Sequence, residues 1–356
     1  MIQKKIIMTG GGSAGHVIPN LTLMPLLESL GYKIYYVGSY DGIERGMVEY
    51  TNTPYFAISS GKLRRYFDLQ NFTDIFRIMK GVWDSIKILH KTKPDVIFSK
   101  GGFVVVPLIF AAWLMGIKVV IHESDLTPGL ANRLAAPFAK KVLVSFPKTL
   151  SYTPRHKTVL TGVPLRSDLL AASKDDGYSF LGFLPEGKPV LLVTGGSLGS
   201  QIINSCVTRM LPQLLECFRV VLLCGRGKKS SISVPGFREY EVLNKDLPNV
   251  LAAADIVVSR AGANTMFELL ALGKPNLLIP LTLNQSRGDQ IANATAFQNN
   301  GFSVMLAEEM LEDCFLDELM SLYERRHEYI ARMTKANFID ADRRIIQIIE
   351  EVAKSG

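Results

Sequence analysis

The chain is poor in the residues that build disulfide scaffolds and metal sites. Among its 356 residues there are 4 cysteines, Cys206, Cys217, Cys224 and Cys314. No two of them form a CxxC pair and none lies near a histidine at metal-ligand spacing, which argues against a disulfide framework or a zinc site. We expect these cysteines to be small buried hydrophobic residues in a reducing compartment.

The chain also lacks a hydrophobic run long enough to cross a membrane. Its longest uncharged stretch, residues 101–117, is shorter than the roughly 20 residues that a spanning helix needs. Because this stretch contains Gly101, Gly102 and Pro107, a strand-end turn followed by a buried helix explains it better. The N-terminal residues lead directly into a short strand, so we expect no signal peptide.

The charge balance is only moderately basic. Charged residues make up 21% of the chain and hydrophobic residues 47%, as in an ordinary globular protein, and the net charge is +7. Because no basic stripe with interleaved aromatic residues is present, nucleic acid is not an expected partner. An anionic membrane surface or an anionic substrate fits this charge better.

Short apolar runs alternate with helical segments along the whole chain. Strands are expected at residues 5–9, 32–37, 56–59, 96–99, 119–122, 142–145, 159–160, 190–194, 255–259 and 276–280, and helices at about 18–30 and 107–115. This alternation predicts an α/β fold with doubly wound parallel sheets. At about 150 residues per domain, the length predicts two domains. We place them at 1–163 and 164–339, with a C-terminal helix at about 340–356 that packs back on the first domain.

A sequence motif that occurs twice supports this division into two domains. MTGGGSAG at 8–15 and VTGGSLGS at 193–200 both place Thr-Gly-Gly after an apolar run and before a helix. Two Rossmann-like halves, each with its own glycine turn, explain the repeated motif. A glycine turn alone is weak evidence for phosphate binding, because many α/β proteins need glycine there for packing.

The stretch from Asp255 to Ala294 carries the strongest functional signal. A turn of small residues after the strand opens a helix, whose unpaired backbone N–H groups suit a phosphate. Glu268, one turn inside the helix, can accept two hydrogen bonds from ribose hydroxyls, and Gln290 follows in the next unit. These features describe a nucleotide-sugar pocket. An ordinary α/β turn with a glutamate near its helix is the alternative.

His16 is the candidate general base. It lies at the start of a helix, where the dipole disfavours imidazolium, so a neutral ring can take a proton from an attacking hydroxyl. Ser13 and Gly15 in the same turn can offer backbone amides to a phosphate. A capping histidine is the alternative, and Glu123 and Asp125 are alternative bases.

Polar residues follow a strand end at His122–Glu123, where α/β proteins present functional side chains. No second histidine follows at helical spacing, so this pair is not a metal motif. Asp125 and Asn132 in the next loop are suited to sugar hydroxyls, or else they only form the turn.

Two further residues suit a phosphate. Arg166 follows the expected domain join, where its guanidinium can bind an anion or form an interdomain ion pair. Ser197 in the second glycine turn can donate a hydrogen bond to a phosphate oxygen. No Asp-x-Asp motif appears where a divalent cation would be expected. A diphosphate held by amides, hydroxyls and arginine needs no metal or other cofactor.

Residues 61–93 combine basic and apolar side chains in an amphipathic pattern. The expected membrane-facing residues of this segment are Phe72, Ile75, Phe76, Arg77, Met79, Lys80 and Trp83. The apolar content exceeds what one buried stripe needs, which favours contact with anionic lipid. The alternative is a long core helix with a solvated basic face.

Four motifs together resemble the MurG family of glycosyltransferases. They are GGGSAGHVIPN, HES with PGLAN, TGGSLGSQIIN, and SRAGANTMFELLALGKPNLLIPL with SRGDQIANA, in that order along essentially the whole chain. The resemblance implies a GT-B fold, with two Rossmann-like domains whose parallel sheets face a central cleft. The last motif is the most specific.

The resemblance also implies an activity. It is the transfer, with inversion, of N-acetylglucosamine from UDP-N-acetylglucosamine to the C4 hydroxyl of the muramoyl sugar of lipid I, which makes lipid II for the cell wall. The enzyme would lie peripherally on the cytoplasmic face of the cell membrane, with other cell-wall synthesis proteins as possible partners. UDP-N-acetylglucosamine is a substrate here, and no cofactor is implied.

The family's functional residues map onto this chain motif by motif. His16 matches the candidate base, and the membrane patch falls on residues 61–93. The residues that match contacts with the sugar donor are Ser13, Ala14, Gly15, Asp125, Arg166, Ser197, Leu243, Ala263, Asn264, Thr265, Met266, Phe267, Glu268 and Gln290.

The chain departs from the family pattern in three places. Ala14 fills one close backbone approach where the common pattern has glycine, and Asp125 replaces the usual asparagine and adds an acid near an anionic substrate. The second turn reads GGSLGS where GGSQGA is common, which leaves Ser197 in place.

Three other functions share parts of this pattern. A diacylglycerol glycosyltransferase has the same fold and type of sugar donor but another acceptor. A UDP-N-acetylglucosamine 2-epimerase has a similar architecture without need of a basic apolar patch. A non-catalytic sugar-nucleotide-binding subunit is the third. Turnover with a lipid acceptor separates them.

Overall fold

The computed structural model describes residues 3–61, 70–196, 198–336 and 340–354, with only the backbone described for residues 70–73. The chain divides into two compact units. The N-terminal unit comprises Met1–Leu165 and Ile339–Gly356, and the C-terminal unit comprises Arg166–Phe338. The division lies close to the join expected at 163 and 164, and each unit is described by itself.

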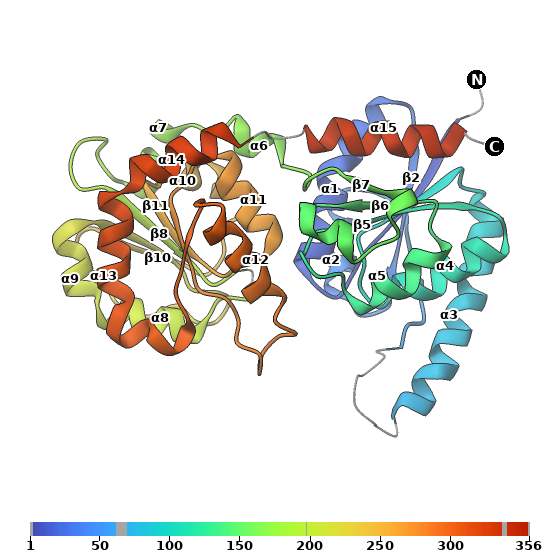
Figure 1. Cartoon of the computed structure of the whole chain (residues 1–356), viewed down its shortest axis with the longest axis horizontal. Coiled ribbons are helices and arrows are strands. Elements are labelled where there is room, and N and C mark those ends of the chain that lie inside the picture. Colours follow the sequence, from blue (N-terminus) through green and yellow to red (C-terminus); the bar gives the residue numbers. More distant parts are fainter. Residues whose placement is uncertain (1–2, 62–69, 197, 337–339, 355–356) are drawn as a thin grey trace. The chain divides into compact units, whose positions relative to one another are not determined.

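The N-terminal unit contains a parallel sheet with helices on both faces (Figure 1). Its strands are β1 (Lys5–Thr9), β2 (Lys33–Ser39), β3 (Tyr55–Ile58), β4 (Val96–Ser99), β5 (Lys118–Glu123), β6 (Lys141–Val144) and β7 (Thr158–Leu160). Its helices are α1 (Ala14–Ser29), α2 (Ile43–Glu49), α3 (Gln70–Thr92), α4 (Val105–Leu114), α5 (Leu130–Ala135), α15 (Ala341–Lys354), η1 (Ala136–Phe138), η2 (Pro147–Ser151) and η3 (Arg155–Lys157). The strand order is β3-β2-β1-β4-β5-β6-β7.

The apolar runs become strands because both faces of this sheet are covered. All four residues of β4 are buried, as are Ile6, Ile7 and Met8 of β1. A strand buried on both faces reads as a continuous apolar run rather than an alternating one, as a parallel sheet requires. The expected strands of this half are therefore present, with ends that shift by a residue or two.

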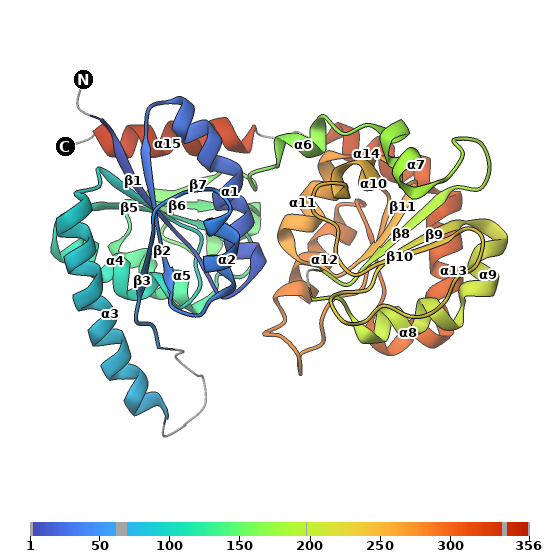
Figure 2. The ribbon, with the colours of Figure 1, turned by 180° about the vertical axis from the view of Figure 1, so that it is seen from behind.

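The C-terminal helix α15 belongs to the N-terminal unit, where it lies beside α1 in both views (Figure 2). Its apolar face, which includes Ile345 and Ile349, is buried in the same core as Leu23 and Leu27 of α1. At its start, the Leu165 backbone N–H donates to Asp342 Oδ1 at 3.1 Å. Burial raises the pKa of that carboxyl to about 6.

The C-terminal unit repeats the same design. Its strands are β8 (Val190–Thr194), β9 (Arg219–Leu223), β10 (Phe237–Tyr240), β11 (Ile256–Ser259), β12 (Asn276–Leu278) and β13 (Val304–Met305). Its helices are α6 (Ser167–Leu170), α7 (Lys174–Leu181), α8 (Gln201–Arg209), α9 (Leu211–Cys217), α10 (Leu247–Ala253), α11 (Ala263–Ala271), α12 (Asp289–Asn299), α13 (Leu311–Glu324), α14 (Arg326–Lys335) and η4 (Glu308–Met310). The parallel order is β10-β9-β8-β11-β12-β13.

The strand order of each sheet places its glycine turn at the topological switch point. In the N-terminal unit β1 pairs with both β2 and β4, and in the C-terminal unit β8 pairs with both β9 and β11. Ligands of open α/β sheets bind outside the carboxyl ends of strands at such points. The two Thr-Gly-Gly turns follow β1 and β8, so both lie where a site is expected.

Two expectations about local structure are wrong. Helix α1 begins at Ala14 rather than near residue 18, because Gly12 has a φ of 81° and Ser13 is an extended N-cap, so the helix starts as soon as the turn ends. Cys217, at the end of α9, is exposed rather than buried. Among the described residues, no helix is both long and apolar enough to cross a membrane.

Candidate active site

The first glycine turn is held in place from beneath by a buried carboxylate. Glu44, on α2, has no exposed surface and accepts hydrogen bonds from the Gly12 N–H at 3.1 Å and from the N–H and hydroxyl of Ser39 at 2.9 and 2.5 Å. A Cβ at Gly42 would lie 2.1 Å from Glu44 Oε1, so a larger residue there would displace this carboxylate. Burial raises the pKa of Glu44, but these hydrogen bonds outweigh it and leave the pKa below its usual value.

The same turn fixes the tautomer of His16. The Nδ1 atom of His16 lies 2.8 Å from the Gly11 carbonyl oxygen and 3.2 Å from Ser13 Oγ. A carbonyl oxygen can only accept, so Nδ1 carries the hydrogen and Nε2 of the neutral ring carries the lone pair. Because His16 is only half-buried, the arrangement suits a general base that acts through Nε2.

The other residues of this turn are open to solvent or nearly so. Ser13 and Gly15 are exposed and Ala14 is half-buried. The Gly12 N–H already donates to Glu44, so it is not available to a phosphate. The contacts of Ser13, Ala14 and Gly15 with a sugar donor stay a prediction.

A buried lysine and histidine lie at the carboxyl ends of β4 and β5. Lys100 Nζ donates to His122 Nδ1 at 2.5 Å and to Ser124 Oγ at 2.6 Å, and His122 Nε2 donates to the Gly162 carbonyl at 2.7 Å. Burial lowers the pKa of Lys100 to about 7, although the charges of Glu123 and Asp125 act in the opposite direction. Burial and the Lys100 charge together lower the pKa of His122 well below its usual range.

Glu123 holds the loop that follows β5. Its Oε1 accepts from the Asp125 N–H at 3.0 Å, and its Oε2 accepts from the Gly129 N–H at 2.8 Å and from Asn132 Nδ2 at 2.9 Å. Because both oxygens are engaged, Glu123 is better suited to fixing this loop than to catalysis. Asp125 is half-buried in that loop, so it stays the alternative base to His16.

The second glycine turn makes the closest backbone approach in the C-terminal unit. A Cβ at Gly199 would lie 1.9 Å from the Cys224 carbonyl oxygen, so no larger residue fits. Lys228 Nζ donates to the carbonyls of Leu198 and Gly199 at 2.9 and 3.2 Å. The predicted phosphate contact of this turn, Ser197, lies outside the described residues.

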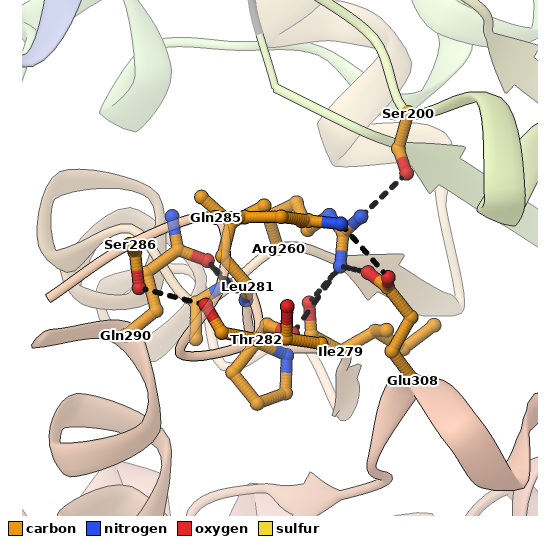
Figure 3. Close-up of polar contacts among 11 residues, drawn as sticks. Ser200, Arg260, Ile279, Leu281, Thr282, Gln285, Ser286, Gln290 and Glu308 are labelled. Carbon is orange, nitrogen blue, oxygen red and sulfur yellow. Dashed lines mark hydrogen bonds and ion pairs between the residues drawn. The ribbon is translucent and has the colours of Figure 1, made fainter. Parts of the chain in front are cut away.

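Arg260 connects the second glycine turn to two other segments (Figure 3). Its Nη2 donates to Ser200 Oγ at 2.7 Å, and its Nη1 donates to the Ile279 carbonyl at 3.2 Å and forms an ion pair with Glu308 Oε2 at 2.5 Å. The other oxygen of Glu308 accepts from Gln285 Nε2 at 3.1 Å. This buried guanidinium therefore ties together the start of α8, the end of β12 and η4.

Helix α11 carries the predicted ribose contact. Glu268 Oε1 lies 3.7 Å from Arg166 Nε, so these two residues, which are far apart in the sequence, form an ion pair. That both contact one ligand stays a prediction. Burial raises the pKa of Glu268, although the Arg166 charge acts in the opposite direction. Ala263 and Met266 are buried in the core, so they can offer a ligand only their backbone, whereas Asn264, Thr265 and Phe267 are partly exposed.

Gln290, on α12, closes the same region. Its Oε1 accepts hydrogen bonds from the N–H groups of Ala261 and Leu281 at 3.2 and 3.1 Å, which orients its Nε2 donor away from these backbone groups (Figure 3). Leu243 lies after β10 and packs, partly buried, against the core beside Leu272. Its expected contact with uracil stays a prediction.

The membrane-facing residues lie on α3. Four apolar side chains, which we call the α3 patch, are exposed: Ile75 by 52%, Phe76 by 73%, Met79 by 64% and Trp83 by 60%. Arg77 and Lys80 on the same helix are exposed too. The side chain of Phe72 lies outside the described residues.

The neighbouring helix α4 adds aromatic residues that the sequence pattern did not single out. Phe110, Trp113 and Leu114 are exposed, and the Phe110 and Trp113 rings lie 5.6 and 5.2 Å from the ring of Phe138. Helix α4 packs against α3, and these residues add exposed apolar area on α4. Their signal in the sequence is an uncharged helix with more apolar positions than one face can bury.

Glu44, Lys100 and Arg260 are the polar residues that the sequence-based predictions missed. Each is charged and nearly or wholly buried, and each lies within two residues of a glycine in a turn. A charged residue within two residues of a glycine at a strand end is the signal that could have found Lys100 and Arg260. Within the described part of the chain, no group of His, Cys, Asp and Glu side chains is placed to hold a metal ion.

The geometry defines a class of protein. Two doubly wound parallel sheets, each with a glycine turn at its switch point, form the architecture of a GT-B glycosyltransferase. Residues 6–144 match the N-terminal domain of glycosyltransferase family 28, and residues 190–349 match its C-terminal domain. The chain belongs to glycosyltransferase family 28 and, within it, to the MurG family.

Full-length relatives carry the finer assignment. The chain is 48% identical over 353 residues to a Clostridium tetani protein, with 98% of each covered, and 51% identical over 356 residues to a Clostridium perfringens protein, with 99% of each covered. Both are named UDP-N-acetylglucosamine–N-acetylmuramyl-(pentapeptide) pyrophosphoryl-undecaprenol N-acetylglucosamine transferase. The crystal structure of Acinetobacter baumannii MurG matches with a TM-score of 0.75 at 22% identity, covering 98% of this chain and 99% of that one, which supports the fold.

Proposed function

We infer that this chain transfers N-acetylglucosamine from UDP-N-acetylglucosamine to lipid I, the undecaprenyl-pyrophosphoryl-N-acetylmuramoyl-pentapeptide, and so makes lipid II for peptidoglycan. The observation that carries this inference is the 48–51% identity over the full chain to relatives named for this reaction. It makes the protein an enzyme, a UDP-N-acetylglucosamine-dependent glycosyltransferase.

The residues divide the reaction between the two units. In the C-terminal unit, α11 offers backbone N–H groups to the donor diphosphate and Glu268 accepts hydrogen bonds from the ribose hydroxyls. Arg166, 3.7 Å from Glu268, favours the ionised form of that carboxylate and so opposes the burial that raises its pKa. The Nε2 donor of Gln290 is suited to a sugar hydroxyl.

In the N-terminal unit, His16 is the proposed base. Its Nε2 takes the proton of the C4 hydroxyl of the acceptor while that oxygen attacks C1 of N-acetylglucosamine. The bond from C1 to the phosphate oxygen breaks, and UDP leaves with the negative charge. One displacement inverts the configuration at C1, and no covalent intermediate with the enzyme forms.

We propose that the reaction needs no metal ion. Backbone amides and Arg166 provide the positive field for the leaving diphosphate, as a helix N-terminus and a guanidinium can. Turnover after exhaustive treatment with a chelator tests this. We expect no change in rate, and a loss that added Mg²⁺ or Mn²⁺ restores would overturn the proposal.

We further propose that the protein works peripherally on an anionic membrane, at its cytoplasmic face. The α3 patch supports this, because its exposed apolar side chains are flanked by Arg77 and Lys80 and by Lys87, whose Nζ lies 5.4 Å from the centre of the Trp83 ring. Apolar residues enter the interface while the cations meet anionic head groups. Cell-wall synthesis proteins are further candidate partners at that surface.

Sedimentation with vesicles that contain anionic phospholipid tests the membrane proposal. Phe76→Ser removes an aromatic ring exposed by 73%, and we expect vesicle binding to weaken by about 5- to 30-fold, equivalent to about 1–2 kcal/mol. Leu184→Ser, at an apolar residue of the C-terminal unit exposed by 77%, is the matched control. Equal binding by both variants would contradict the proposed surface.

Turnover is the test of the function itself. Purified full-length protein is given radiolabelled UDP-N-acetylglucosamine and a lipid I analogue, and a labelled lipid disaccharide is the expected product. His16→Ala should lower kcat by about 10²- to 10⁴-fold, as loss of a general base does, whereas His327→Ala, at an exposed histidine of α14, should not.

Two other results would change the assignment. Full activity of His16→Ala would move the base to Asp125, since both oxygens of Glu123 hold the loop after β5. If the wild-type chain glycosylates diacylglycerol instead of the lipid I analogue, the fold and the sugar-donor site stand and the acceptor is wrong.

A further inference from the structure

Lys100 is a buried amine with no carboxylate at ion-pair distance among the described residues. Its side chain is 1% exposed, and its two hydrogen-bond partners, His122 and Ser124, are both neutral. Burial of its charged form is costly, and the charges of Glu123 and Asp125 offset only part of that cost, so a bound anion would stabilise the ammonium form further.

The position of Lys100 points to where that anion binds. It follows β4 and directly precedes Gly101 and Gly102, and a Cβ on Gly102 would lie 2.3 Å from the Gly11 carbonyl oxygen. The Gly11 N–H donates to the Gly101 carbonyl at 3.2 Å. Lys100 therefore lies under the place where the turn after β4 packs against the first glycine turn.

Ser124 connects this buried charge to the surface. Its Oγ accepts a hydrogen bond from Lys100, so its own hydrogen must point elsewhere. Ser124 is half-buried, and a hydroxyl polarised by an ammonium group is a strong hydrogen-bond donor. The carboxyl edge of the N-terminal sheet thus offers a charge-assisted donor of the kind that a phosphate oxygen accepts.

We propose that Lys100 is a positioning residue for a substrate diphosphate. The Ser124 hydroxyl donates a hydrogen bond to the diphosphate, and the charge of Lys100 behind it strengthens that bond. This inference rests on the proposed function, because both substrates of that reaction carry a diphosphate. It also accounts for Asp125, since the charge of Lys100 offsets the negative charge that Asp125 adds beside an anionic ligand.

The proposal has a consequence for protons. Because the pKa of Lys100 is about 7, the side chain is mostly neutral at pH 8, and a bound anion favours its charged form. The charged and titratable groups around it are His122 and Glu123 of β5 and Asp125 of the next loop. On the side of the first glycine turn lie the Asn20 amide and, in the turn itself, His16.

Titration calorimetry on the full-length protein tests this at pH 8, in two buffers that differ in ionisation enthalpy. We expect diphosphate binding to take up close to one proton, and the Kd to rise about fivefold from pH 7 to pH 8. UDP and a soluble lipid I analogue are titrated separately. Uptake with UDP assigns the charge to the sugar donor, and uptake with the analogue assigns it to the acceptor.

Variants identify the group that takes up the proton. Lys100→Met should abolish the uptake and Ser124→Ala should weaken binding of the same ligand, whereas Lys157→Met, at a lysine that binds the Pro137 and Ala139 carbonyls, should change neither. Wild-type protein that makes lipid II but takes up no proton with either ligand would overturn this inference alone. Uptake that persists in Lys100→Met would overturn it too.

Discussion

The two glycine turns follow the same kind of strand in sheets of the same order, yet the side chains that hydrogen-bond to them carry opposite charges. Beneath the first turn lies the carboxylate of Glu44, which takes up the Gly12 N–H. Beside the second lies the guanidinium of Arg260, which donates to Ser200, while Lys228 donates to the turn's carbonyls. The same kind of turn is therefore held by a hydrogen-bond acceptor in the N-terminal unit and by hydrogen-bond donors in the C-terminal unit.

This difference separates the tasks of the two units. Glu308 offsets the charge of Arg260, so the positive charge at the second turn comes from Lys228, and it suits a diphosphate. A carboxylate that occupies an amide of the first turn makes that turn less suited to an anion and more suited to orienting His16, whose Nδ1 bonds to the Gly11 carbonyl. On this account the positive charge that the N-terminal unit offers to a diphosphate beside the first turn comes from Lys100.

The largest expected effect breaks the support of the second turn. Arg260→Met leaves Glu308 buried without its partner, and we expect the C-terminal unit to lose about 3–5 kcal/mol of unfolding free energy. Urea unfolding measures this. The control is Arg325→Met, whose partner Glu328 is exposed, and it should cost less than about 1 kcal/mol. Equal losses would mean that the buried pair has no special role.

A smaller effect tests which unit binds the sugar donor. Glu268→Gln keeps the size of the side chain and removes the charge, and we expect the KM for UDP-N-acetylglucosamine to rise roughly ten- to hundredfold, equivalent to about 1.5–3 kcal/mol. Steady-state kinetics with a saturating lipid I analogue measures it. An unchanged KM would remove Glu268 from the sugar-donor site.

The support of the first turn is tested by Glu44→Gln. The new amide places an N–H against the Gly12 N–H or the Ser39 N–H, and we expect about 1–3 kcal/mol of lost stability together with a lower kcat. Glu49→Gln, at an exposed residue of the same helix, should leave both unchanged.

The pH dependence gives a second measure of Glu44. Because its pKa is lower in the folded chain, the stabilisation is present above the unfolded value of 4.5 and is lost as the pH falls through the folded value. Wild-type stability should therefore fall below pH 4.5 more steeply than that of Glu44→Gln. Parallel acid curves would contradict the role of this carboxylate.

The smallest effect concerns Lys228. Lys228→Met removes two hydrogen bonds to the carbonyls of the second turn. We expect the sugar donor to lose about 0.5–1.5 kcal/mol of binding free energy, which is a roughly 2- to 10-fold rise in its KM. Lys229→Met, at the exposed neighbouring residue, is the control. A change in kcat alone would show that the second turn is not a binding element.

Much of the fold can be predicted from local patterns. Apolar runs predicted strands such as β4 and β8, because both faces of a parallel sheet are buried. Strand β10 did not stand out, since Phe237–Tyr240 holds two charged residues, and β13 contains only Val304–Met305. The pairing order of the strands depends on contacts far apart in the sequence and is not visible in any local pattern.

The candidate site was predictable where a residue type marks a motif. The glycines, His16 and Glu268 each occur at a strand end or helix start, which a sequence displays. Burial of a charged side chain is not displayed, because it depends on tertiary packing, so Glu44 and Lys100 were missed. The ion pair of Arg166 with Glu268 joins residues far apart in the chain, and the sequence predicted only that both contact one ligand.

The most direct test of this account compares one variant from each turn in the same assay. Steady-state kinetics of lipid II synthesis, with the concentration of UDP-N-acetylglucosamine varied, separate kcat from the KM for the sugar donor. We predict that Glu44→Gln lowers kcat and leaves this KM near the wild-type value, while Arg260→Lys chiefly raises this KM. If both variants change the same parameter, or each changes the other's, the proposed division between the two turns is wrong.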